Sequence, residues 1–237
     1  VTHSWYEYKE GDSKSKHPWD GYTNYKYTGP KPPYEFLDTN KKYSWLKAPR
    51  YEEMPIEVGP LSRMLVAYGS GHKRVKEVVD FVLKKLEVGP AVLFSTLGRV
   101  AARGIETLVT AELLPDFINE LAANMKKGDY KIHNGDKWEP STWPKDAKGY
   151  GLYEAPRGAL GHWIKINNGR IENYQCVVPG TWNGSPRDAK GQRGPFEEAL
   201  IGTPVANIDQ PVEILRTIHS FDPCMACAVH VVDAEGK

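Results

Sequence analysis

The stretch VGPLSRMLVAYGSGHKRVKEVVDFVLKKLEVGP, residues 58–90, decides the architecture of this chain. Apolar residues recur at helical spacing behind a Gly-Pro start, and a Gly-Ser-Gly run ends this first segment. Residues 73–88 repeat the pattern, with charged side chains on the opposite face. The stretch therefore predicts two amphipathic helices. Their apolar positions are Leu61, Met64, Leu65, Tyr68, Val75, Val78, Val79, Val82 and Leu86.

Residues 91–127 favour helix nearly throughout, and small residues such as Ala101, Ala102 and Gly104 would allow close helix packing. Pro115 is expected to start a new helix or to kink this one, because it removes a backbone donor. We therefore expect a helix bundle over about residues 58–127.

The period changes after a polar connection over residues 128–150. Residues 160–166 and 171–178, joined by Asn-Asn-Gly, predict a β-hairpin. A compact loop over residues 179–188 follows. Short helices are then expected over residues 196–200 and 212–219. The predicted fold class is α+β, mainly helical, with a hairpin and a loop-rich C-terminal region.

The first 57 residues read as an extended aromatic segment, rich in Tyr, Trp, Gly and Pro, that wraps a surface. So many aromatic residues argue against disorder. We expect residues 1–237 to form one domain, with the extended segment (1–57), the helices (58–127) and the hairpin with the C-terminus (128–237) as its parts.

Composition narrows the function classes. The chain has 31 basic and 30 acidic side chains, a net charge of +1, and this balance gives no global attraction to nucleic acid. Three cysteines are too few for a disulfide-stapled secreted scaffold, so their use is expected to be chemical. No apolar run approaches the ~20 residues that span a bilayer. A membrane location would therefore have to come through a partner.

The segment SFDPCMACAVH, residues 220–230, carries the strongest chemical signal. Two thiols three residues apart can face one metal ion, and His230 can approach the same place. A haem attachment site would need histidine directly after Cys227, so that reading is excluded. A thioredoxin-like redox pair is disfavoured, because this pair follows a helix at the end of the chain. A zinc site with Cys176 as fourth ligand and a catalytic metal both stay open on spacing alone.

The same segment resembles the C-terminal DPCxxC motif and histidine of nickel–iron hydrogenase large subunits of the uptake, membrane-bound type. Further stretches resemble that family in the same order along the chain, which makes accidental similarity very improbable. They are HSWYEY (3–8), YTGPKPPYEFLD (27–38), KYSWLKAPRY (42–51), EVGPLSRMLVAY (57–68), EAPRGALGHW (154–163) and NYQCVVPGTWNGSPRD (173–188).

The resemblance implies a nickel–iron centre that cleaves dihydrogen, with cyanide and carbon monoxide on the iron. Cys224 would be a terminal nickel thiolate and Cys227 a bridging one. Arg157 would stand over the metals, where its guanidinium can hydrogen-bond a cyanide and polarise bound hydrogen or accept its proton. Asp222 would pair with that arginine. Arg157, Asp222 and Cys224 are therefore the catalytic candidates.

Other expected residues surround this centre. Pro156 and Pro179 would lie beside the cofactor together with Gly180, where the family usually has a hydroxyl residue. His230 would bind a magnesium ion with the main-chain carbonyl of Cys176, which suits the preference of magnesium for oxygen.

The resemblance also implies partners. The family's N-terminal RxCGxC motif has no counterpart here, so we expect the C-terminal half of a large subunit, inactive alone, that needs the N-terminal half. An iron–sulfur small subunit would carry electrons and attach the complex to the periplasmic side of the cell membrane. A maturation peptidase would cut after His230, which makes residues 231–237 look like an unprocessed tail. The alternatives are a metal-free subunit like those of quinone reductases and a zinc-stabilised interaction module.

Overall fold

The protein is described by a computed structural model. Elements are numbered from β1 (Tyr6–Tyr8) and β2 (Thr23–Tyr25), which pair as an antiparallel two-stranded sheet. Cys227, His230, the tail after it and the motif at 27–38 lie outside the described residues. The described residues are 4, 6–8, 16–21, 23–25, 40 and 42–224.

Helices α1 (Pro60–Gly69) and α2 (Lys73–Lys85) form where the apolar spacing predicts them. Pro60 starts α1, where its missing N–H costs nothing. The His72 ring accepts a hydrogen bond from the Val75 N–H at 3.3 Å and caps α2. This helix ends three residues earlier than predicted, because Glu87 takes a left-handed conformation (φ 55°). Leu86 is consequently 62% exposed instead of part of the core.

Helix α3 (Thr96–Lys126) follows a short 3₁₀ turn, η1 (Pro90–Leu93). The Ser95 side chain caps it by accepting the Gly98 N–H at 3.0 Å. Gly98 allows this tight entry, since a Cβ there would lie 2.2 Å from the Leu93 carbonyl oxygen. No new helix begins at Pro115, because α3 continues through it.

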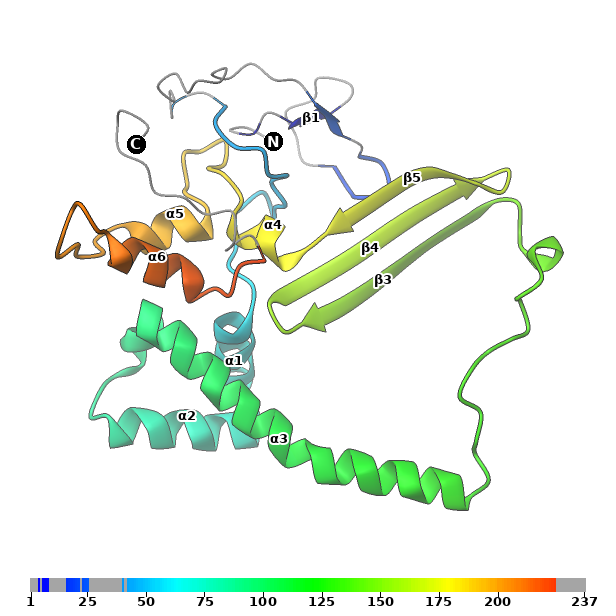
Figure 1. Ribbon diagram of the computed structural model, residues 1–237, viewed down its shortest axis with the longest axis horizontal. Helices are drawn as coiled ribbons and strands as arrows, with labels where there is room; N and C mark the ends of the chain where they lie inside the picture. Colours follow the sequence, from blue (N-terminus) through cyan, green and yellow to red (C-terminus); the bar gives the residue numbers. More distant parts are fainter. Residues whose placement is uncertain are drawn as a thin grey trace.

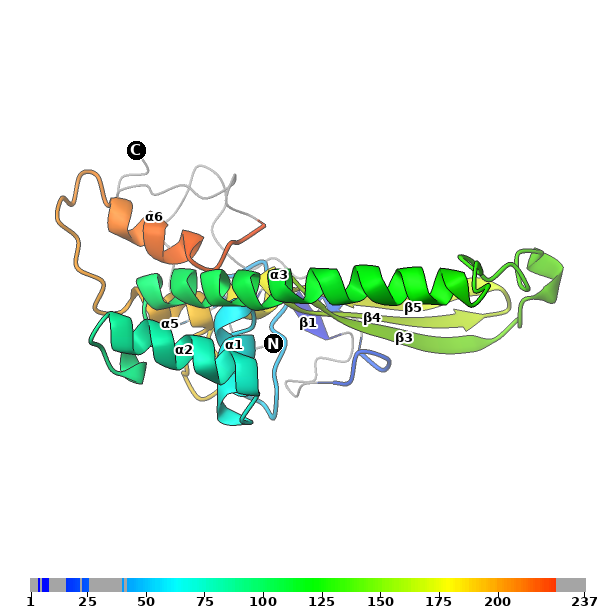
Figure 2. The ribbon, with the colours of Figure 1, turned by 90° about the horizontal axis from the view of Figure 1, so that it is seen from below.

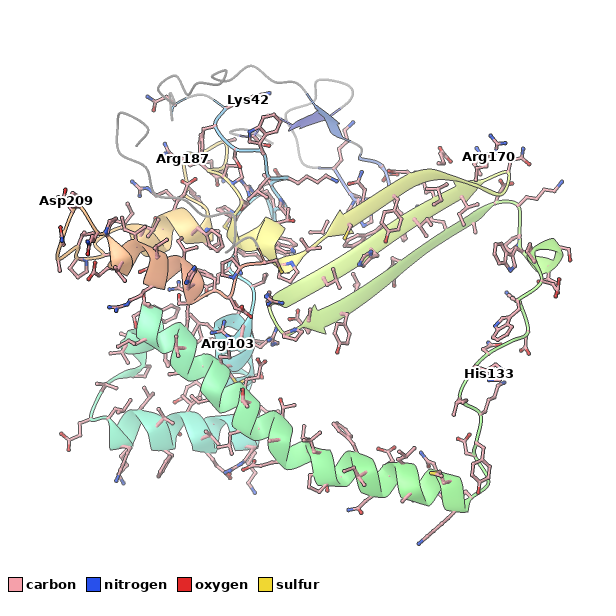
Figure 3. The ribbon with its side chains drawn as sticks, in the orientation of Figure 1. Lys42, Arg103, His133, Arg170, Arg187 and Asp209 are labelled. Atoms are coloured by element: carbon pink, nitrogen blue, oxygen red, sulfur yellow. The ribbon has the colours of Figure 1, made fainter. Side chains whose placement is uncertain are left out.

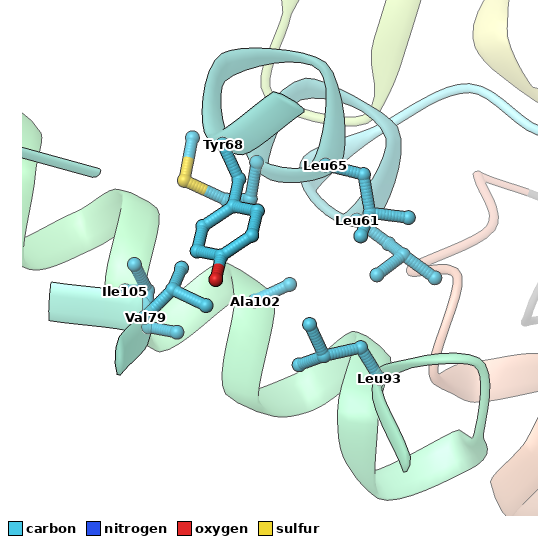
Figure 4. A pocket seen from close by; sticks show the side chains of 8 residues that line it. Leu61, Leu65, Tyr68, Val79, Leu93, Ala102 and Ile105 are labelled. Carbon is cyan, nitrogen blue, oxygen red and sulfur yellow. The ribbon is translucent and has the colours of Figure 1, made fainter. Parts of the chain in front are cut away.

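The hydrophobic core lies between α1, α2 and α3 and is built from Leu61, Val75, Val78, Val79, Leu83, Leu93, Ala102 and Ile105. The predicted helix bundle is therefore confirmed in the first half of α3. Figure 4 shows Tyr68 reaching across Val79 and Ala102. The cavity among these side chains is about 10 Å³, room for about one water molecule.

Val79→Ala should lower the free energy of unfolding by about 2 kcal/mol, because the side chain is only 2% exposed and its loss leaves a cavity. Val66→Ala is the matched control on the neighbouring helix, where the side chain is 70% exposed and the change should stay within about 0.5 kcal/mol. Urea denaturation followed by circular dichroism measures both. Equal effects at the two positions would show that Val79 is not a core residue.

The predicted hairpin is confirmed as β4 (Gly158–Asn167) and β5 (Arg170–Val177), with Asn168 and Gly169 in left-handed conformations at the turn. The sheet also has a third strand, β3 (Ala147–Ala155), antiparallel to β4. Its start was wrongly assigned to the polar connection. The sequence hid it because Gly149 and Gly151 interrupt the alternation of apolar residues.

The chain after the sheet carries three short helices, α4 (Pro179–Asn183), α5 (Pro195–Leu200) and α6 (Val212–His219). The last two were predicted, whereas the loop expected over 179–188 begins with the helical turn α4. The rings of Phe196 and Phe221 pack edge to face at 4.9 Å and join α5 to the end of α6.

Figures 1 and 2 show the arrangement of these parts. The N-terminal half of α3 crosses the body next to α2, and α6 lies on its other side. The sheet and the C-terminal half of α3 both extend from the body, and the turn between β3 and β4 lies beside α1. Within the described part of the chain, each helix is too short or too polar to span a bilayer.

Candidate metal centre

The segment that leaves α6 presents Cys224 at the surface. The Asp222 N–H donates to the His219 carbonyl at 2.9 Å, and Asp222 adopts a left-handed conformation (φ 53°). Aspartate is one of the few residue types that visit this region, and Pro223 after it cannot continue a helix. Pro223 is buried, whereas Cys224 is exposed and outside any disulfide. The turn therefore anchors the chain and leaves the thiol accessible.

Arg157 meets this turn from the sheet. Its Nε donates to the Asp222 main-chain oxygen at 2.8 Å and lies 3.2 Å from Oδ2, while Nη2 lies 3.4 Å from Oδ1. The two side chains are 43% and 47% exposed. An ion pair this exposed adds little to stability. The contact brings the guanidinium of Arg157 to Asp222, which precedes Cys224 by two residues in the sequence.

A tight turn of two residues, Pro156 and Arg157, joins β3 to β4 and holds the arginine. Gly158 (φ 134°) makes it possible, since a Cβ there would lie 2.7 Å from a methyl group of Val58. Gly59 (φ 128°) faces the turn from the other side, where an added Cβ would lie 3.0 Å from the Arg157 carbonyl oxygen. The start of α1 is thus pressed against the turn.

Arg63 on α1 grips the same turn. Its Nη1 donates to the Ala155 carbonyl and to Glu154 Oε2, both at 2.9 Å, and its Nη2 donates to the Pro156 carbonyl at 2.9 Å. Nε and Nη2 also bind the carboxylate of Glu106 on α3, at 2.5 and 2.9 Å. The hydrogen bonds to Glu106 raise the pKa of Arg63 more than its burial lowers it. The guanidinium is therefore a permanent cation in this position.

Pro179 and Gly180 lie at the start of α4, directly after β5. Asn183 at the end of α4 accepts the Val58 N–H at 2.9 Å and donates to the Val58 carbonyl at 2.8 Å. This buried pair fixes α4 against the segment that also supports the arginine turn. Pro179 is buried, and a Cβ at Gly180 would meet no atom within 4 Å. A side chain added at Gly180 would therefore enter open space.

Cys176 lies on β5, half-buried, with its Sγ 3.8 Å from His162 Nε2. The other ring nitrogen of His162 bonds the Tyr174 hydroxyl. Lys47 donates to Gln175 at 2.9 Å beside this thiol, and burial lowers the pKa of that lysine. His162 is thus hydrogen-bonded through both ring nitrogens to neighbouring side chains, which is typical of a structural histidine.

Residues on α3 support the segment after α6 from below. Arg99 binds the Glu57 carboxylate through two contacts of 2.8 Å, and its guanidinium stacks 4.1 Å from the Phe221 ring. Arg103, labelled in Figure 3, donates to the Ser220 carbonyl at 3.0 Å. Sequence reasoning missed these arginines, as it missed Arg63 and Asn183. The signal of the three arginines was a charged residue within an otherwise apolar or small-residue helical stretch, whereas Asn183 lay in a stretch that was predicted to be a loop.

Only some of the proposed metal ligands belong to the described residues. Among residues 42–224 and the shorter described stretches, no three His, Cys, Asp or Glu side chains cluster closely enough to hold a metal ion. Cys224 is the single proposed side-chain ligand among the described residues, because Cys227 and His230 lie outside them.

Comparison with known proteins identifies relatives along the whole chain. The sequence profile of the nickel-dependent hydrogenase family matches residues 1–230. Uptake hydrogenase large subunits from Bradyrhizobium diazoefficiens and Rhodobacter capsulatus are 52% and 51% identical over 243 and 242 residues. These alignments cover 100% of this chain but only 41% and 40% of the relatives, so the chain spans about two-fifths of their length.

Solved structures give the same grouping. The Ni-Fe-Se hydrogenase from Desulfomicrobium baculatum, in a reduced, active form, matches with a TM-score of 0.71 and 38% identity over 97% of this chain and 44% of its own. The Ni-Fe-Se hydrogenase from Desulfovibrio vulgaris Hildenborough in the reduced state matches with a TM-score of 0.67 and 35% identity, again over 97% of this chain and 44% of its own.

Proposed function

This chain belongs to the nickel-dependent hydrogenase family, and we propose on that premise that it is part of the catalytic large subunit of a nickel–iron hydrogenase. The reaction would be the reversible heterolytic oxidation of dihydrogen. The observation that carries the proposal is the contact of Arg157 with Asp222 beside Cys224. That contact joins two residues that are 65 positions apart in the sequence. Because the ion pair is exposed, it contributes little to the stability of the fold.

The residues present fit such a centre. Cys224 offers a soft sulfur ligand that suits nickel, and it is exposed and free of a disulfide. Cys227 would supply the second thiolate. Pro156, Pro179 and Gly180 would line the iron, with its cyanide and carbon monoxide ligands. His230 and the carbonyl of Cys176 would hold magnesium. A chain with these three cysteines alone lacks the remaining thiolates, so we expect it to bind no complete centre and to be inactive by itself.

When bound, the centre would supply the cleavage of dihydrogen, which overall yields two protons and two electrons. Arg157 would present N–H donors to the negative charge that develops there, in a fixed direction that costs no reorganisation. Asp222 would hold the fork in that direction through its carboxylate and carbonyl oxygens. Pro179, buried at the start of α4, would keep water from that side.

The partners follow from the same proposal. Electrons would leave through an iron–sulfur small subunit, and that partner would attach the complex to the cell membrane on its periplasmic side. The rest of the large subunit would supply the missing thiolates, and a peptidase would cut after His230. The metal-free and zinc-binding alternatives are disfavoured, because the match extends through the segment with both cysteines.

The test is to purify the complete large subunit containing this chain with its small subunit, after coexpression with maturation factors. Hydrogen-dependent dye reduction and elemental analysis should find activity together with stoichiometric nickel and iron. Zinc in place of nickel would favour the interaction module, and a metal-free complex without activity would favour the structural subunit. Either result would reject the proposal.

A further inference from the structure

We infer that Arg63 is a positioning residue that fixes the direction of Arg157 by holding the backbone of its turn. The inference rests on the proposed function insofar as Arg157 stands at the metal centre. Arg63 itself contacts the turn at the two carbonyls that precede Arg157, those of Ala155 and Pro156. It is therefore placed to act on the catalytic candidate through the main chain.

All the hydrogen-bonding capacity of Arg63 is used in this position. A guanidinium has five N–H donors in a rigid plane. The structure supplies an acceptor for each: two oxygens of Glu106, one of Glu154 and the two turn carbonyls. The Arg63 side chain is 20% exposed and that of Glu106 is 22% exposed. The carboxylate of Glu106 thus fixes the orientation of the Arg63 guanidinium plane, and that plane in turn positions the two turn carbonyls.

The turn is short, so the position of its backbone depends on contacts from other elements. Two residues connect β3 to β4, and Gly158 after them has φ 134°. The Arg157 side chain is half-exposed, and its hydrogen-bond partner among the described residues is Asp222. A backbone shift of about 1 Å at a catalytic group can lower a rate about 100-fold. By binding the carbonyls of Ala155 and Pro156, Arg63 therefore controls the direction in which the Arg157 side chain points.

The distinguishing variant is Arg63→Lys in the complete large subunit. Lysine keeps the charge, but its point-like ammonium cannot bind two carboxylates and two carbonyls in one plane. Arg74→Lys is the matched control, because Arg74 on α2 also binds a glutamate of α3, Glu112, through contacts of 2.7 and 2.5 Å. Arg74 contacts Glu77 and Glu112 instead of the turn, so its replacement tests the loss of an interhelical arginine–glutamate pair alone.

The first measurement is hydrogen–deuterium exchange of the metal-free large subunit. The amides of Ala155, Arg157, Gly158 and Ala159 should exchange about tenfold faster in Arg63→Lys than in wild type and Arg74→Lys, since local opening follows lost backbone support. Unchanged exchange at the turn would overturn the inference. This exchange measurement does not depend on whether the complex oxidises dihydrogen. A wild-type complex without hydrogen uptake would therefore reject the proposed function, while the exchange rates would still decide whether Arg63 holds the turn.

The second measurement is a double-mutant cycle on the metal-loaded complex. Arg63→Lys should lower kcat about tenfold with unchanged KM for hydrogen and unchanged nickel. Added to Arg157→Lys it should lower kcat no further, because a residue that acts through Arg157 has nothing left to position. Losses that multiply would show a merely structural role. If Arg63→Lys gives no soluble complex, Glu106→Gln replaces it, with an expected effect of about threefold on both measurements, and its absence would equally overturn the inference.

Discussion

Replacing Cys224 by serine is expected to abolish hydrogen uptake by the assembled enzyme and to remove most of its nickel. A hydroxyl at neutral pH stays protonated and is a hard ligand, whereas nickel in this proposal is held by thiolates. Loss of groups that only orient a ligand already costs 10–100-fold in metal affinity, so loss of the ligand itself should cost more than about 100-fold. Elemental analysis and hydrogen-dependent dye reduction measure the two effects.

Cys227→Ser should behave in the same way, although that residue lies outside the described part of the chain. His219→Gln is the control, because His219 is exposed on the last turn of α6, close in sequence and not assigned to the metals. It should retain nickel and activity. Full activity in Cys224→Ser would remove this cysteine from the ligand set, and lost nickel in the control would indicate general misfolding of the segment.

The elements that sequence predicted well are those whose signal is local. Amphipathic spacing and a Gly-Pro start are enough for α1, and alternation around an Asn-Gly turn is enough for β4 and β5. The strand β3 has no such signal. Its side chains are largely exposed, and its place comes from pairing with β4, where Gly161 has no side chain and Trp163 covers the space. Pairing with β4 therefore makes residues 147–155 a strand, although their local sequence pattern does not predict one.

The extent of α3 shows the opposite error. Pro115 was expected to start a new helix or to kink this one, and the first alternative is wrong, because the helix passes it and continues to Lys126. Six apolar residues of its second half are at least 43% exposed: Leu113, Leu114, Phe117, Ile118, Leu121 and Met125. Sequence reasoning recognised these residues as helix-forming, but could not tell that the described core ends near Ile105.

The candidate site divides in a similar way. Arg157, Asp222 and Cys224 were recognisable because they sit in motifs, and the structure joins the first two by direct contact. The supporting contacts of Arg63, Arg99 and Asn183 were not recognisable. Each joins residues 42 to 125 positions apart, so their partners exist only in the folded chain. Roles of individual residues at the metals stay predictions until variants are measured.

Arg157→Lys is expected to retain nickel and iron yet to lower kcat about 100-fold, the scale reported for losing one preorganised donor at developing charge. Lysine keeps the positive charge but not the planar fork, which here divides its donors between the main-chain oxygen and the carboxylate of Asp222. The metals should stay because no proposed ligand changes. Metal content and steady-state hydrogen uptake are the measurements, with Arg170→Lys, exposed at the first position of β5, as control.

The comparison with Asp222→Asn separates the effect of the direction of the Arg157 side chain from the effect of the charge on Asp222. Asparagine keeps the turn and one side-chain oxygen, while the main-chain oxygen that Arg157 Nε binds at 2.8 Å is unaffected. We therefore expect a smaller loss, about tenfold, in Asp222→Asn than in Arg157→Lys. If Arg157→Lys instead loses its nickel, the arginine is a structural support of the Cys224 segment. If it keeps both nickel and full activity, the planar fork is dispensable and the catalytic assignment of Arg157 is wrong.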